Sequence, residues 1–97
     1  MNGVHLRRLP PFTTLLIQTA NSLYRLVITQ GPEVYVQGGV FFPDLTSAYV
    51  EGSSGGGSLE VDWIGVGLRV QFRSRGYRIV TSPVRVITSQ VLPTIVH

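Results

Sequence analysis

The chain has 97 residues, of which 43% are hydrophobic and only 13% are charged, and its formal net charge is +3. This length suits one small domain, and the apolar content excludes an intrinsically disordered chain. The absence of cysteine excludes disulfides, zinc–thiolate sites and thiol chemistry. All eight basic residues are arginine, which excludes Schiff-base chemistry and a nucleotide-binding loop with its lysine.

Apolar and polar side chains alternate with a period of two along most of the chain, a pattern typical of half-buried strands. No segment has the 3.6-residue apolar period of a helix over ten residues. Short breaks rich in Gly, Pro, Asn and Ser separate the predicted strands, as turns require. In chain order these strands cover 14–19, 23–28, 34–37 with a continuation over 40–42, 46–51, 59–63, 68–73, 77–80 and 84–86.

Paired glycines, Gly38 and Gly39, interrupt the third strand and predict a bulge or a sharp bend of the kind that small barrels need. We therefore predict an all-β fold consisting of one small barrel of about five to seven short, mostly antiparallel strands. Its size is that of SH3-like and Sm-like barrels, although this is an analogy of architecture and implies no function. The barrel domain is expected to span residues 1–97, with 1–12 and 90–97 as terminal segments.

Four stretches of the sequence, NSLYRLVI, VQGGVFF, GSSGGGS and IVTSPVR, carry a resemblance to small uncharacterised bacterial proteins of about this length. The resemblance covers roughly residues 14–87. It implies a small β-barrel, but no activity, cofactor or site residue.

The stretch from Gly52 to Ser58 is the most motif-like part of the sequence. A phosphate cradle of the nucleotide-binding kind needs Gly-Lys-Ser/Thr followed by a helix. Here no lysine follows, and Leu59 begins a predicted strand. The interpretation that we favour is a flexible hairpin tip, which could close over a ligand.

Arginines are concentrated in the C-terminal third, where residues 65–97 contain five arginines and no acidic residue. On a hairpin they could present guanidinium groups to a nucleic acid or another polyanion. Two alternatives remain: the arginines are the polar face of an apolar hairpin, or they pair with Glu51, Glu60 and Asp62, either within the chain or across a subunit contact. The five candidate residues are Arg69, Arg73, Arg75, Arg78 and Arg85. The aromatic residues that could stack on bases mostly occupy core-like positions in the pattern: Tyr24, Tyr35, Phe41, Phe42 and Tyr77.

Catalytic chemistry is poorly supplied. Glu60 and Asp62 are two residues apart and are expected on one face of a strand, where two solvated carboxylates are the simplest interpretation. The two histidines, His5 and His97, lie near the chain ends and complete neither a triad nor a metal site. The TSPVR stretch could bind a small anion, but a strand-ending turn is the simpler reading. We therefore expect no enzyme activity, no cofactor and no metal.

The low charge content leaves few residues to protect exposed strand edges, and the tail over residues 91–96 is apolar. These features predict a non-catalytic binding or assembly module that self-associates, with a polyanion binder as the alternative. No apolar run approaches the ~20 residues that a membrane-spanning helix needs. Residues 1–11 are not followed by a signal-peptide pattern. We expect a cytoplasmic protein without a membrane span.

Overall fold

The computed structural model describes residues 2–90, and the apolar tail lies outside this range. The described chain is built from strands, with one short 3₁₀ turn, and confirms the all-β prediction. The elements are β1 (Gly3–His5), η1 (Leu6–Arg8), β2 (Thr14–Thr19), β3 (Leu23–Gln30), β4 (Glu33–Gly38), β5 (Phe42–Ser54), β6 (Glu60–Val61), β7 (Trp63–Gly65), β8 (Arg69–Ser74) and β9 (Tyr77–Gln90).

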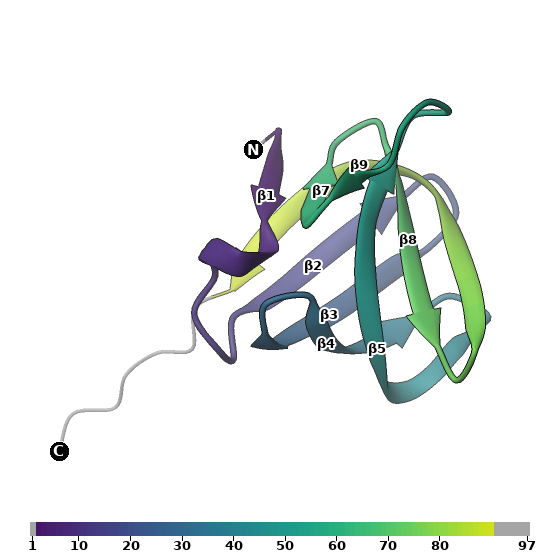
Figure 1. The fold of residues 1–97 in the computed structure, drawn as a ribbon. Helices are drawn as coiled ribbons and strands as arrows, with labels where there is room; N and C mark the ends of the chain where they lie inside the picture. The colour runs from purple at the N-terminus through teal and green to yellow at the C-terminus, as the bar shows by residue number, and fades with distance from the viewer. Residues whose placement is uncertain (1, 91–97) are drawn as a thin grey trace, which may run out of the picture.

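Six of these strands close into a ring, visible in Figure 1 as a curved wall around the centre of the molecule. The order around the ring is β4-β3-β2-β9-β8-β5, and β5 pairs with β4 to complete it. Every pairing is antiparallel, and β6 adds to the far half of β5. Because the ring is closed, the six barrel strands have lost the free edges that an open sheet of these strands would expose.

The predicted alternation places one side of each barrel strand in the interior. On β2, Leu15 and Ile17 are buried, and they face Leu26 on β3 and Ile87 on β9 in the register of the sheet. Each fully buried aliphatic side chain of this kind stabilises the fold by about 1.5–3 kcal/mol. The centre of the core also holds an edge-to-face ring pair, Phe42 with Phe72, whose centroids are 5.4 Å apart.

Two strands are longer than the sequence predicted, because each continues through an irregularity and pairs with different neighbours along its length. The predicted strand over 46–51 is the middle of β5, which pairs with β4 and then with β8. The predicted break at Ser82 and Pro83 is a bulge inside β9, not a turn. There the Thr81 hydroxyl accepts a hydrogen bond from the Val70 N–H at 3.0 Å, so the side chain replaces a missing partner in the ladder.

The glycine pair at 38–39 also differs from expectation. Residues 39–41 form the turn between β4 and β5, so Val40 and Phe41 do not continue a strand. Gly38 has φ 139°, and a Cβ atom there would lie 2.1 Å from the Leu23 carbonyl oxygen. Only glycine fits this close approach of two backbones.

One end of the barrel is covered and the other is open. The two-stranded sheet of β1 and β7 lies at the covered end (Figure 1), where Val4, Leu6 and Ile64 join the barrel core. The turn between β4 and β5 and the turn between β8 and β9 both lie at the other end of the barrel, away from β1 and β7. We call this open end the barrel mouth.

Candidate functional site: the barrel mouth and the arginine hairpin

Two of the five candidate arginines, Arg73 and Arg78, share a carboxylate partner. Arg73 and Arg78 lie directly opposite each other on β8 and β9, an arrangement that repels unless a counter-charge intervenes. Glu51 on β5 supplies it, with ion-pair distances of 2.8 Å to Arg73 Nη2 and 3.3 Å to Arg78 Nε. The structure thus contains the pairing that the sequence left open as one alternative for these two arginines.

Glu51 is held in its charged form by the same cluster. Its Oε1 accepts a hydrogen bond from Gln71 Nε2 at 3.0 Å, and its side chain is only 14% exposed. The hydrogen bond from Gln71 and the charges of Arg73 and Arg78 lower the pKa of Glu51, and they outweigh the opposing effect of burial. Glu51 therefore carries a full negative charge at neutral pH and neutralises part of the hairpin.

The other three arginines have no carboxylate partner within residues 2–90. Arg69 donates one hydrogen bond, from Nη1 to the Thr81 carbonyl oxygen at 3.4 Å. Arg75 lies at the tip of the β8–β9 hairpin with φ 53°, and Gly76 follows with φ 81°. A two-residue turn with two positive φ angles favours Asn-Gly or Gly-Gly, so an arginine here is strained by about 1 kcal/mol.

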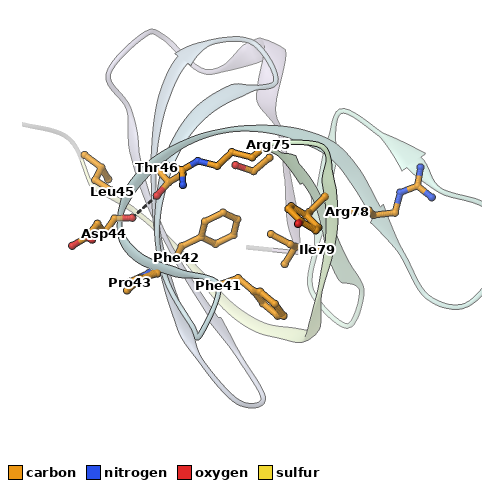
Figure 2. Close-up of a pocket in the computed structure, with 11 residues that line it drawn as sticks. Phe41, Phe42, Pro43, Asp44, Leu45, Thr46, Arg75, Arg78 and Ile79 are labelled. Atoms are coloured by element: carbon orange, nitrogen blue, oxygen red, sulfur yellow. Dashed lines mark hydrogen bonds between the residues drawn. The ribbon is translucent and has the colours of Figure 1, made fainter.

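Arg75 lines a pocket in the barrel mouth that the sequence pattern does not predict. The pocket has a volume of about 490 Å³, within the range of small-molecule and side-chain binding pockets. Figure 2 shows Phe42 and Ile79 pointing toward the middle of the ring, so they form the floor. The Arg78 side chain points away from the ring, whereas the Arg75 side chain extends across the mouth toward Thr46.

The rim of the pocket is unusually apolar for a surface. Phe41 is 65% exposed and Tyr77 is 73% exposed, and Leu45, which also lines the pocket, is exposed as well. Val40 protrudes further, with 87% of its surface exposed, at the tip of the β4–β5 turn. The only acidic residue that lines the pocket is Asp44, which is exposed and makes no ion pair with any described residue.

The aromatic residues differ from the core-like positions expected of them. Tyr24 and Phe42 are buried as predicted, but Tyr35, Phe41 and Tyr77 are exposed. The signal that could have shown this is the position of Phe41 and Tyr77 directly beside turn residues, where strand alternation no longer sets which way a side chain points.

The glycine-rich stretch is only partly a loop. Its first two residues, Gly52 and Ser53, belong to β5 and are buried, and the irregular segment is confined to residues 55–58. The Ser53 hydroxyl donates to the Trp63 carbonyl oxygen at 2.6 Å and accepts from the Gly65 N–H at 3.2 Å. This part of the stretch therefore fastens β7 to the barrel, which corrects the interpretation of the whole stretch as a flexible tip.

The proposed carboxylate pair also fails to form on one strand face. Asp62 has φ 63° and lies between β6 and β7, so the alternation from Glu60 is broken. The Asp62 Oδ2 atom pairs with Arg7 Nε at 3.5 Å and also accepts from the Arg7 N–H at 3.3 Å. The remaining oxygen, Oδ1, is buried without a hydrogen-bond partner among the described residues.

His5 packs its ring against Trp63, with the centroids 4.6 Å apart, so it is part of the β1–β7 sheet and not a frayed end. His97 lies outside the described residues. Across the described 2–90 range, no group of three or more His, Asp or Glu side chains is arranged to hold a metal ion.

Comparison with known proteins gave no match to any family model, to any curated protein or to any solved structure. The part of the chain that the structure describes contains no helix with the length and hydrophobicity to span a membrane.

Proposed function

We propose that this protein is a non-catalytic β-barrel module for binding and assembly, and that it self-associates. The observation that carries the proposal is the apolar rim of the barrel mouth, where Val40, Phe41 and Tyr77 are each more than 60% exposed. Large exposed apolar patches are rare on monomers and mark interaction sites, and clustered aromatic and aliphatic side chains around a pocket favour such a site. Aromatic residues around a pocket are also the side chains most often found at the energetic centre of an interface.

The physical route to self-association differs from the one expected from the sequence. Ring closure removes the free edges of the barrel strands, so edge-to-edge pairing of barrels gains no support. The apolar tail over residues 91–96, the other feature expected to drive association, lies outside the described residues. The mouth combines a pocket with three large exposed apolar side chains that line it, Phe41, Leu45 and Tyr77.

The test is sedimentation equilibrium or light scattering of the full chain over a wide range of concentrations. We expect the mass to rise above the 10.6 kDa of the monomer as the concentration increases. Val40→Asp should shift this rise to higher concentration, since a charge at the tip of the turn would be desolvated on association. Val86→Asp is the matched control, because Val86 is 54% exposed on the outer face of β9 and lies away from the mouth pocket. A wild-type chain that stays monomeric at every concentration would overturn the proposal.

A second candidate function is binding of a nucleic acid or another polyanion. Its support is that Arg69, Arg75 and Arg85 make no ion pair within residues 2–90, and that no acidic residue occurs after residue 64. The pairing of Arg73 and Arg78 with Glu51 weighs against it. Titration with single-stranded RNA and DNA at low and moderate salt separates the two functions, because phosphate-driven binding weakens steeply with salt. Arg69→Gln with Arg85→Gln should remove such binding and leave self-association unchanged.

The cytoplasmic location expected from the sequence is part of the proposal. Its support is a sequence without cysteine, which needs no oxidising compartment for folding. Fractionation of cells that express the protein at its native level tests this location.

A further inference from the structure

The mouth carries one free positive and one free negative side chain. Arg75 and Asp44 both line the pocket and are both exposed. Neither makes an ion pair with a described residue, whereas Arg73 and Arg78 are already bound to Glu51. In Figure 2 the Arg75 side chain extends toward Thr46, and Asp44 lies further along the rim on the outer side of β5. One mouth thus offers two opposite charges that are separated on the same rim.

Such a rim is complementary to itself. In a dimer with two-fold symmetry every contact occurs twice. If one residue of the first copy contacts a second residue of its partner, the same second residue of the first copy contacts the same first residue of the partner. Two mouths facing each other can therefore place Arg75 of each copy against Asp44 of the other and form two equivalent ion pairs. A single-sign rim would instead repel a second copy.

The apolar part of the mouth is also complementary to itself. Val40 is 87% exposed at the tip of the β4–β5 turn and does not line the pocket of its own chain. The pocket of about 490 Å³ beside it, with Phe42 and Ile79 as its floor, has room for an apolar side chain from outside. Each copy thus presents a protruding apolar side chain, Val40, and a mouth pocket with room to receive it.

We propose that the partner of the barrel mouth is a second copy of this chain, bound mouth to mouth about a two-fold axis. Val40 of each copy enters the pocket of the other, and Arg75 pairs with Asp44 across the interface. The strained backbone of Arg75 fits this role, because the positive φ angle holds the side chain at the hairpin tip where it can cross the mouth. This inference rests on the self-association proposed above and adds its geometry.

The test is a charge exchange measured by analytical ultracentrifugation of the full chain. Arg75→Asp alone and Asp44→Arg alone each place like charges opposite each other twice in the dimer. We expect each variant to raise the dimer Kd by about tenfold or more. An equimolar mixture of the two variants should form a heterodimer near wild-type affinity, because both contacts are then between opposite charges. The double variant should restore the homodimer for the same reason.

These outcomes separate the geometry from self-association itself. If the wild type dimerises and the single variants dimerise equally well, or the mixture forms no heterodimer, the mouth-to-mouth geometry is refuted while self-association stands. If the wild type remains monomeric, self-association fails. Far-ultraviolet circular dichroism of each single variant checks the fold, and recovery in the mixture shows that neither variant is simply unfolded. Arg69→Asp is the control, since the same charge change away from the mouth should leave Kd within about twofold.

Discussion

Replacing Ser53 by alanine tests how the covered end is attached to the barrel. The Ser53 side chain is completely buried, and its hydroxyl joins two backbone groups of β7, the Trp63 carbonyl and the Gly65 N–H. A net contribution of about 1 kcal/mol for each hydrogen bond, with a further cost for stranding buried backbone groups, gives a loss of about 2–3 kcal/mol. Against a total stability of about 5–15 kcal/mol for a domain, this is a large effect.

The measurement is equilibrium unfolding in urea at one fixed protein concentration, because self-association would otherwise shift the apparent stability. We expect the midpoint to fall with an unchanged slope, and Tm to fall by about 10–20 °C. Ser58→Ala is the matched control, since Ser58 is exposed in the adjoining loop and should change stability by less than about 0.5 kcal/mol. A Ser53→Ala protein as stable as the Ser58→Ala protein would refute the role given to this hydroxyl.

Three further predictions follow from backbone strain and charge. Arg75→Asn creates the preferred Asn-Gly turn and should stabilise the monomer by about 0.5–1 kcal/mol in thermal unfolding, while weakening self-association; a less stable monomer would contradict the strain argument. The folded-state pKa of Glu51 is lowered, so its stabilising contribution is complete above pH 4.5 and is lost as the pH falls through the lowered pKa. The difference in unfolding free energy between the wild type and Glu51→Gln should therefore decrease as the pH is lowered. A difference that stays constant down to low pH would contradict this prediction. Gly38→Ala should cost about 2 kcal/mol or more, because its Cβ would meet a carbonyl of β3, whereas Gly57→Ala, whose Cβ meets nothing within 4 Å, should cost under about 0.5 kcal/mol.

Period-two alternation was sufficient to predict the fold class and most strands. Leu15 and Ile17, or Val70 and Phe72, are buried as the pattern requires because the barrel interior is the one water-free region available to them. The pattern could not predict that β5 and β9 continue through their bends. A bulge such as the one at Thr81 depends on a side chain filling a gap in the ladder, which follows from the register of two strands and not from either alone.

The sequence predicted the candidate site only in part, because its contacts depend on which strands are neighbours and on the conformation of individual turn residues. The sequence identified the arginines and named Glu51 as a possible partner, but which arginines it binds depends on β5 and β8 being neighbours. The mouth was missed because β4 ends at Gly38 and residues 39–41 form a turn instead of a continued strand, which leaves Phe41 exposed. The positive φ of Asp62, which separates it from Glu60, is a conformation that aspartate tolerates but that alternation does not reveal.

Backbone amide NMR spectra recorded over a dilution series test most directly whether the protein self-associates through the barrel mouth. The account predicts that residues of the β4–β5 turn and the β8–β9 tip, with Val40, Arg75 and Tyr77 at their centre, shift with concentration. Residues on the outer face of β2 and β3 should keep their positions. Spectra that do not change on dilution, or shifts confined to the outer face of β2 and β3, would contradict it.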